Sequence, residues 1–328
     1  MFTCGDEEMK KIAIVTSGGD APGMNAAIRA VTRVACSEGL EVLGFERGWN
    51  GLMTNTYRKL DERNVGGILH LGGTILRTSR SPEFRKKANV QKAADTLALN
   101  KVDGLVVVGG EGSMHGALEL SKRTGTLIVG IPATIDNDVY GTDETIGFDT
   151  AVNTAINEID KIRDTASAHE RIFIVEVMGR KRGFLALTIG LTVGAEAILV
   201  PEVEYTVEET VKTLEINRNK GKLSGIIVAA EGIGSTHKLL KEIEKQSGME
   251  VRLSIIGYAQ RGGNPTARSR LLATLFGNKA VQMLKNGEGG MMVTQQDGKT
   301  STIELEQACC KEKPLNMNLM KLAETVAT

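Results

Sequence analysis

The sequence predicts an α/β fold of two domains, each built on a mainly parallel sheet. The chain has 328 residues, and typical domains of roughly 150 residues make this length enough for two. From Lys11 onward, short β-branched runs alternate with polar glycine-rich turns and segments of helical spacing, the pattern of a parallel sheet with helical connections. The 38 glycines are about 12% of the chain against a usual ~7%, which indicates many tight turns or close backbone approaches.

The first strand, turn and helix set the pattern for the rest. Residues 12–15 are a buried-strand candidate, residues 16–23 form the turn, and Ala27, Val31 and Val34 repeat on one helix face. The unit recurs where the runs 105–108, 127–129, 172–175, 226–228 and 253–256 lead into GGEGS, PATIDND, EVMGR, AAEG and GYAQRGG. Ligands of open α/β sheets bind beyond the carboxyl ends of the strands, so the six polar clusters are candidate contributors to ligand sites.

A long helix is predicted after Asp149. Val152, Ile156 and Ile159 are spaced by four and then three residues, which places them on one helix face. We expect the crossing from one domain to the next just before this helix.

The charge and cysteine content exclude several classes of protein. Lys plus Arg and Asp plus Glu number 40 each, so no net field attracts nucleic acid or a membrane, and neither is an expected partner. Cys4, Cys36, Cys309 and Cys310 contain no Cys-x-x-Cys pair, which argues against a zinc site or a disulfide framework. The chain has no signal-peptide pattern and no run of about 18 apolar residues, which predicts a cytoplasmic protein.

Two glycine-rich turns are candidates for phosphate binding. Gly18-Gly19 and Gly109-Gly110-x-Gly112 stand where a strand turns into a helix, an arrangement that points backbone N–H groups at an anion. Either turn alone is equally consistent with a tight turn that binds nothing. Neither contains Gly-Lys-Ser/Thr or reads G-x-G-x-x-G, which argues against P-loop and dinucleotide sites.

Residues 134–138 read Thr-Ile-Asp-Asn-Asp and directly follow a predicted strand. Phosphoryl transfer needs one carboxylate to accept the proton of the nucleophile and others to hold magnesium, and this cluster contains both kinds of group. The alternative is a plain surface turn, because Asp and Asn are frequent in turns.

Five arginines lie in or beside the strand-end clusters or their flanking turns: Arg80, Arg171, Arg180, Arg252 and Arg261. Any one of them is well explained by a carboxylate partner. Together with the glycine turns they indicate binding of polyphosphate and sugar phosphate, because the guanidinium fork matches phosphate oxygens.

The motifs, in this order, resemble those of bacterial-type ATP-dependent 6-phosphofructokinases, from Lys11 to about Gln307. The resemblance is carried by TSGGDAPGMNAAIRA (16–30), PEFR (82–85), TIDND (134–138), GTDETIGFDTA (141–151), EVMGR (176–180) and QRGG (260–263). It implies two Rossmann-like three-layer domains with the active site in the cleft between them. Residues 1–146 with 259–310 would form the larger nucleotide-binding domain, and 147–258 with 311–328 the smaller sugar-phosphate-binding domain.

The resemblance also implies the reaction, which is transfer of the γ-phosphoryl group of Mg-ATP to the 1-hydroxyl of fructose 6-phosphate. Asp136 would be the general base, Thr134 would lie beside the transferred group, Asp138 would help to order Mg²⁺, and Arg180 would stabilise transition-state charge. Glu111 would be the magnesium-linked carboxylate. The residues implied to contact ATP are Gly19, Arg80, Ser81, Gly110, Glu111, Gly112 and Ser113.

The implied sugar-phosphate site draws on both halves of the chain and on a neighbouring subunit. Its residues would be Thr134, Ile135, Asp136, Met178, Gly179, Arg180, Glu231, Tyr258 and Arg261, with Arg171 and Arg252 reaching in from the neighbour of a homo-oligomer, typically a tetramer. An ADP or phosphoenolpyruvate effector would bind at Arg29, Arg33, Arg58, Arg163, Glu196, Lys220 and Lys222.

Five residues depart from the family pattern. Glu111 stands for an aspartate, Ala133 for a glycine and Tyr258 for a histidine, while Arg77 replaces a small or aromatic residue and Phe184 an aspartate. These departures leave open a non-catalytic or differently specific regulatory homologue.

Two further alternatives concern the phosphoryl donor and the substrate. Pyrophosphate-dependent relatives carry an aspartate and a lysine where this chain has Gly112 and Ala133, which favours ATP as the donor. The other alternative, an NAD or lipid kinase, is supported only by the GG-x-G turn and leaves the EVMGR, QRGG and GTDETIGFDTA motifs unexplained.

Overall fold

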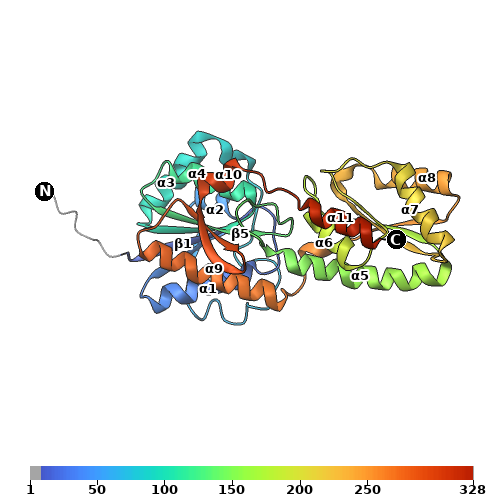
Figure 1. The fold of residues 1–328 in the computed structure, drawn as a ribbon. Helices are drawn as coiled ribbons and strands as arrows, with labels where there is room; N and C mark the ends of the chain where they lie inside the picture. The colour runs from blue at the N-terminus through green and yellow to red at the C-terminus, as the bar shows by residue number, and fades with distance from the viewer. Residues whose placement is uncertain (1–8, 328) are drawn as a thin grey trace. The chain divides into compact units, whose positions relative to one another are not determined.

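A computed structural model of the chain describes residues 9–327, which form two compact units (Figure 1). Cys4 lies outside the described residues. The chain passes between the units more than once: unit 1 comprises the described residues up to 134, with 138–147 and 263–313, and unit 2 comprises 135–137, 148–262 and 314 onward.

The eight-stranded sheet of unit 1 has the order β12-β11-β5-β4-β1-β2-β3, with β6 beside β5. Strands β11, β5, β4, β1 and β2 are parallel neighbours, and the edge strands β3 and β12 pair antiparallel. Its strands are β1 (Lys11–Ser17), β2 (Glu41–Phe45), β3 (Tyr57–Leu60), β4 (Gly104–Gly109), β5 (Leu127–Thr134), β6 (Ile146–Gly147), β11 (Met291–Gln296) and β12 (Lys299–Glu304).

Helices cover both faces of this sheet, as Figure 1 shows. On one face α1 (Met24–Ser37) packs along α9 (Ala267–Lys285), and a Cβ added at Gly277 would lie 2.6 Å from the Cβ of Ala30. The other face carries α2 (Trp49–Met53), α3 (Lys87–Leu99), α4 (Glu111–Ser121) and α10 (Leu305–Cys310), with the short 3-10 helix η1 (Pro82–Arg85).

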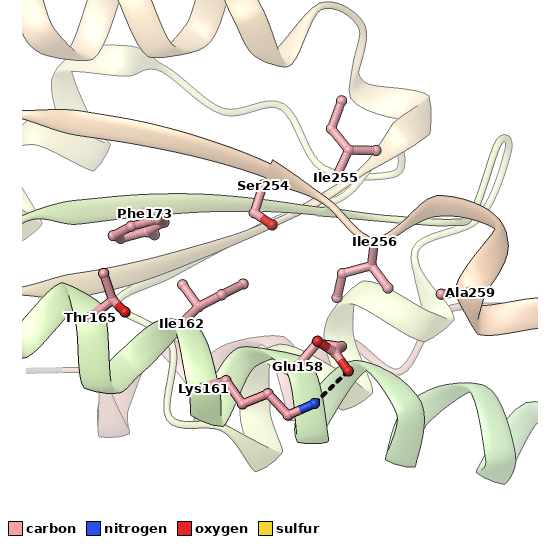
Figure 2. Close-up of a pocket in the computed structure, with 9 residues that line it drawn as sticks. All are labelled: Glu158, Lys161, Ile162, Thr165, Phe173, Ser254, Ile255, Ile256 and Ala259. Carbon is pink, nitrogen blue, oxygen red and sulfur yellow. Dashed lines mark hydrogen bonds and ion pairs between the residues drawn. The ribbon is translucent and has the colours of Figure 1, made fainter.

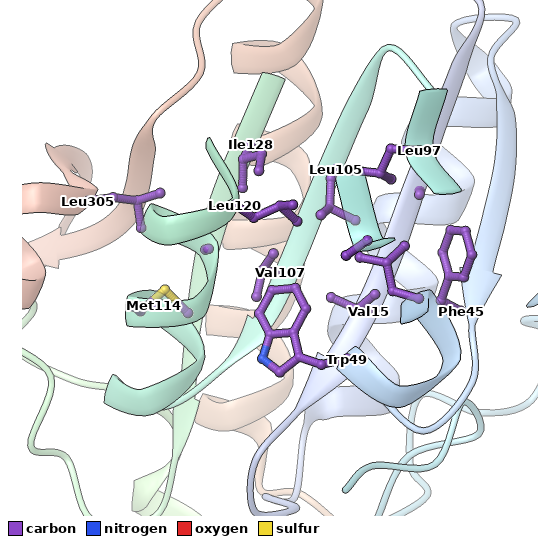
Figure 3. Packing of buried hydrophobic residues seen from close by; sticks show 14 of the residues in the cluster. Val15, Phe45, Trp49, Leu97, Leu105, Val107, Met114, Leu120, Ile128 and Leu305 are labelled. Carbon is purple, nitrogen blue, oxygen red and sulfur yellow. The ribbon is translucent and has the colours of Figure 1, made fainter. Parts of the chain in front are cut away.

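The second face holds a large apolar core (Figure 3). Strand residues such as Val15, Leu105 and Val107 pack against Trp49, whose ring stacks on that of Phe84 with centroids 4.3 Å apart. Trp49 is therefore a core residue that joins α2 to η1 and α4.

Unit 2 has a smaller sheet of four parallel strands in the order β10-β7-β9-β8. These strands are β7 (Ile172–Val177), β8 (Ala197–Leu199), β9 (Gly225–Ala230) and β10 (Val251–Ile255). On one face lie α7 (Val207–Asn219) and α8 (Thr236–Ser247), and on the other α5 (Phe148–His169), α6 (Phe184–Thr192) and α11 (Met317–Val326). Two 3-10 helices, η2 (Glu231–Ile233) and η3 (Gly257–Arg261), follow strands β9 and β10.

Local sequence explains where several of these helices begin. Thr206 and Ser235 precede α7 and α8, and each side chain accepts a hydrogen bond from a backbone N–H of the first helical turn. The core of this unit packs Ile174 and Ile227 of the sheet against Leu214 and Ile243 of the two helices.

The predicted α/β class with mainly parallel sheets is confirmed, and all six predicted strands are present. The expectation omitted six of the twelve strands, because none of them carries a continuous β-branched run. These are β2 and β11 inside the larger sheet, its edge strands β3 and β12, and the short strands β6 and β8. No helix within residues 9–327 is both long and apolar enough to cross a membrane.

Replacing Leu105 by Ala tests the core beneath the predicted site. Leu105 is fully buried in β4, so we expect the free energy of unfolding in urea to fall by about 2–5 kcal/mol. Leu99 at the end of α3 is 72% exposed, and its replacement by Ala is the matched control, with an expected change within about 0.5 kcal/mol. Equal losses for the two variants would contradict this assignment of the core.

Candidate active site

The segments that follow three strands of unit 1 start at one edge of its sheet, because β5, β4 and β1 are parallel neighbours whose carboxyl ends align. Ser17, Gly109 and Pro132 are register partners in adjacent strands, so the turns that follow them start at the same level. The Ser113 hydroxyl donates to the Ser17 carbonyl at 2.9 Å, and a Cβ added at Gly110 would lie 3.3 Å from that of Thr134. The two glycine turns and the start of the 134–138 cluster are therefore direct neighbours.

Glycine is required at position 109 by this close packing. A Cβ there would lie 2.5 Å from both the Ser17 carbonyl oxygen and the Ser113 hydroxyl oxygen. The turn after β4 can approach the turn after β1 only without a side chain at this point.

Helix α4 begins at the centre of this edge, immediately after Gly110. The first backbone N–H groups of a helix have no partner within it, so the N-terminus favours an anion. Glu111 and Gly112 in the first turn are exposed, whereas Ser113 is buried and holds the turn in place. Glu111 lies one helical turn from His115, with 3.8 Å between its carboxylate oxygen and Nε2.

The segment 77–81 runs beside the first glycine turn. Thr78 donates to the Gly18 carbonyl at 3.0 Å, and the Gly18 N–H donates to the Ser79 carbonyl at 3.3 Å. Ser81 donates to Asn50 at 2.8 Å, and Arg80 is exposed. The two predicted nucleotide contacts from this segment therefore lie near Gly19 on the same edge.

Residues 134–138 turn sharply as they leave β5. Asn137 is buried and has φ +52°, a left-handed conformation that Asn adopts more readily than most residues. Asp136 and Asp138 on either side of it are partly exposed, and Ile135 is buried. The turn therefore leaves the carboxylates of Asp136 and Asp138 partly accessible, while Ile135 and Asn137 are buried.

A loop of residues 139–145 follows and holds the turn from behind. Thr145 donates to the Thr134 carbonyl at 2.6 Å, and β6 pairs Ile146 with Ala133. Further along, Asp143 N–H donates to the Gln295 carbonyl at 2.7 Å, and Arg268 contacts Glu144 at 2.5 Å.

Two of the departures from the family pattern, Ala133 and Phe184, have structural explanations, whereas nothing in the structure explains Arg77. Ala133 lies within β5 and needs no left-handed backbone, so the alanine fits. Arg77 has φ +58°, and its carbonyl accepts a hydrogen bond from Thr16 at 2.8 Å while its side chain is exposed. Phe184 is buried as the first residue of α6.

The strand ends of unit 2 form a second cluster. The Arg180 guanidinium lies 3.4 Å from the Glu231 carboxylate, and the Gly232 N–H donates to the Gly179 carbonyl at 3.1 Å. Gly179 has φ +129°, and a Cβ there would lie 2.6 Å from the Arg182 carbonyl oxygen, so only glycine suits this turn.

The turn after β10 joins the same cluster. Tyr258 is 74% exposed, and the Arg261 guanidinium carbon lies 5.8 Å from its ring centroid, within cation–π range. Gln260 is fully buried and accepts a hydrogen bond from the Met178 N–H at 2.8 Å. Its Nε2 has no hydrogen-bond partner among residues 9–327. No motif in the sequence indicated the hydrogen bond between Met178 and Gln260.

Arg171 and Arg252 lie at the opposite end of this sheet, where β7 and β10 begin. They are therefore not part of the strand-end cluster of their own chain, although the sequence placed them in or beside such clusters. Arg171 contacts Glu250 at 2.9 Å, and this guanidinium holds the pKa of the Glu250 carboxyl below its usual range. Arg252 also contacts Glu250.

The residues predicted to bind an effector fall in both units. In unit 2, the buried Glu196 carboxylate contacts Lys222 and accepts a hydrogen bond from the Ile226 N–H. Arg163 donates a hydrogen bond to the Val193 carbonyl. Lys220 is exposed. In unit 1, Arg58 donates to the Ile75 carbonyl, and Arg29 and Arg33 lie on α1.

The carboxylates fit magnesium that arrives with a nucleotide. Within residues 9–327, no three His, Cys, Asp or Glu side chains are grouped so that they hold a metal ion alone. Magnesium is usually held by one or two carboxylates together with substrate phosphates, and Glu111 and Asp138 are of this kind.

Two features were not predicted from the sequence. Unit 2 has a pocket of about 370 Å³ between α5 and the β7–β10 edge, lined among others by Ile162, Phe173 and Ile256, with Lys161 and Glu158 paired at 2.8 Å (Figure 2). It contains none of the predicted site residues.

The second unpredicted feature is Lys313, which donates to the Asp143 carbonyl at 3.0 Å. Burial lowers the pKa of this lysine to about 8, although Asp143, Asp138 and Glu144 favour its charged form. The residues next to Lys313 in the sequence form no motif, so they did not indicate that this lysine contacts the loop 139–145.

Known proteins resemble this chain over nearly its whole length. A sequence model of the family described as phosphofructokinase matches residues 11–284. The ATP-dependent 6-phosphofructokinase 1 of Clostridium perfringens is 48% identical over 318 residues, 97% of this chain and 99% of that protein. The protein of that name from Thermus thermophilus is 47% identical, over 97% of this chain and all of its own length (100%).

Solved structures agree. Phosphofructokinase from Saccharomyces cerevisiae has a TM-score of 0.86 and 33% identity, covering 97% of this chain and 46% of the longer yeast chain. A pyrophosphate-dependent phosphofructokinase from Marinobacter aquaeolei, with a TM-score of 0.84 over 94% of this chain and 86% of its own, is 22% identical and supports the fold. The family predicted from the strand-end motifs is confirmed, and this chain belongs to the phosphofructokinase family.

Proposed function

We propose that this chain is a glycolytic kinase that transfers the γ-phosphoryl group of Mg-ATP to the 1-hydroxyl of fructose 6-phosphate. The products are fructose 1,6-bisphosphate and ADP, and the reaction takes place in the cytoplasm. One observation carries the proposal: the glycine turns after β1 and β4 meet Thr134, the start of the 134–138 cluster, at one sheet edge. The names of the relatives support the same reaction.

Unit 1 is the proposed nucleotide-binding part. The free N–H groups at the start of α4 and the turn at Gly19 bind phosphate oxygens, with Arg80 and Ser81 beside them. Glu111 and Asp138 hold Mg²⁺, which when bound neutralises charge on the transferred phosphoryl group.

Asp136 is the proposed general base, which accepts the proton of the sugar 1-hydroxyl. Thr134 lies beside the transferred group, and Arg180 stabilises the charge that develops on it. The tight turn at Asn137 fixes the directions of the two flanking carboxylates.

Unit 2 is the proposed sugar-phosphate-binding part, through Met178, Gly179, Glu231, Tyr258 and Arg261. Arg171 and Arg252 lie far along the sheet from these strand ends, which supports a role in the site of a neighbouring subunit. We therefore propose a homotetramer, with ADP or phosphoenolpyruvate bound at the basic residues around Glu196 and on α1.

Glu111 and Tyr258 favour one alternative, a regulatory or differently specific homologue. Glu111 displaces the metal-binding carboxylate by one methylene, and Tyr258 carries no positive charge. The retained Thr134, Asp136, Asp138 and Arg180 favour catalysis, because a site that had lost its activity would be expected to lose the base and the transition-state arginine as well.

The direct test supplies the purified protein with fructose 6-phosphate and magnesium, and with either ATP or pyrophosphate. We expect fructose 1,6-bisphosphate with ATP alone. Turnover with pyrophosphate alone would overturn the choice of donor, and binding of ATP without turnover would support the regulatory homologue.

Placing an aspartate at Gly112 tests the donor. A Cβ at Gly112 has no atom within 4 Å, so the Gly112→Asp variant is expected to fold. Its side chain would occupy nucleotide space, and we expect kcat/KM for Mg-ATP to fall at least about tenfold. Exposed Gly125 also has no neighbour within 4 Å, and Gly125→Asp is the matched control with unchanged kcat/KM.

The Asp136→Ser variant tests the general base. We expect kcat to fall by about 10²- to 10⁴-fold while affinity for fructose 6-phosphate stays within about tenfold, because the base acts in the chemical step. Steady-state kinetics measure both constants, and Asp160→Ser on the exposed side of α5 is the control. A kcat equal to that of the unaltered protein would remove Asp136 from this role.

A further inference from the structure

Residues 311–313, here called the C-terminal strap, lie between α10 and α11 and contact the loop 139–145. The Lys313 amine donates to the Asp143 carbonyl at 3.0 Å. The Lys311 amine lies 5.4 Å from the ring centroid of Tyr140, within cation–π range. Lys311 and Lys313 of the strap therefore contact two residues, Tyr140 and Asp143, of the loop that follows the proposed base.

The same loop is tied directly to the carboxylate cluster. Its last residue, Thr145, donates to the Thr134 carbonyl at 2.6 Å, and Ile146 pairs with Ala133. Its first residue follows Asp138. A displacement of the loop is therefore transmitted to both ends of the 134–138 turn.

The charges around Lys313 are mostly negative. The carboxylates of Asp143, Asp138 and Glu144 all act on it, and Arg268 of α9 is a cation on another element that pairs with Glu144 at 2.5 Å. Phosphoryl transfer brings further negative charge to this cluster, so a cation behind it has a use in catalysis.

Lys313 is partly buried beside these carboxylates. Burial disfavours the charged amine despite the three carboxylates, which the lowered pKa of Lys313 records. An apolar side chain of similar length would avoid this cost of burial. The hydrogen bond to the Asp143 carbonyl places this amine where it can hold the loop 139–145 beside the carboxylate cluster.

We propose that Lys313 is a positioning residue for the reaction, and that it acts through Asp143 and the loop 139–145 to hold Asp136 and Asp138 in place. The inference rests on the proposed function, and it assigns the strap a role in kcat. The hydrogen bond that the structure gives Lys313 is to the Asp143 carbonyl, and the proposed role is therefore positioning rather than direct catalysis.

The test compares Lys313→Met, Lys313→Arg and Lys321→Met in the full chain. Lys321 is an exposed lysine of α11, so its replacement is the matched control. Each variant is measured for kcat, for KM of fructose 6-phosphate, for thermal stability and for hydrogen exchange of residues 136–145.

For Lys313→Met we expect kcat to fall by about 10- to 100-fold, because small displacements of reacting groups cost this much. We expect KM for fructose 6-phosphate within about threefold, an unchanged or raised melting temperature, and faster exchange in residues 136–145. Lys313→Arg keeps the charge and a donor, and should recover at least about a third of the original kcat. Lys321→Met should leave all four quantities unchanged.

A lowered melting temperature with unchanged kcat would show a merely structural lysine and overturn the proposal. Equal loss of kcat in Lys313→Arg and Lys313→Met, or unchanged exchange in residues 136–145, would also overturn it. If the unaltered protein does not phosphorylate fructose 6-phosphate, the proposed function fails. Exchange and stability then still decide whether Lys313 holds the loop.

Discussion

The site depends on one constraint, the parallel alignment of β1, β4 and β5. Parallel neighbours in register end at the same level, so three turns that are far apart in the sequence begin side by side. Glycines at 109 and 110 let these turns approach closely, and the buried Ser113 hydroxyl ties the turn of β4 to the end of β1. The start of α4 and Thr134, where the 134–138 segment begins, then lie on one edge without any long loop to place them.

The smaller sheet repeats this principle with a different set of side chains. The carboxyl ends of β7, β9 and β10 bring together two arginines, a glutamate and a tyrosine, and the fully buried Gln260 links two of the turns. In a chain with no net charge, these cations are concentrated by topology rather than by composition. The other two arginines, at the opposite end of the sheet, contact Glu250 and support a contribution to a neighbouring molecule.

Four of the five departures from the family pattern, all except Arg77, fall into two groups when their positions in the fold are known. Ala133 lies in a regular strand and Phe184 is buried at a helix start, so both are explained by local packing. Glu111 and Tyr258 are exposed at strand ends, where their lengths and charges bear on ligands. The physical question about activity therefore rests on these two residues.

The sequence by itself determined the α/β class, six of the twelve strands and the residue types at the ends of those six. These follow from local patterns, since a buried strand needs β-branched residues and a strand-to-helix turn needs glycine. Only the tertiary structure decided which turns meet, that Arg171 and Arg252 lie at the opposite end of their sheet, and that Gln260 is buried behind Met178. It also decided the place of Lys313, whose partner Asp143 is 170 residues away in the chain. Such contacts depend on strand order and helix packing, and no pattern of neighbouring residues encodes them.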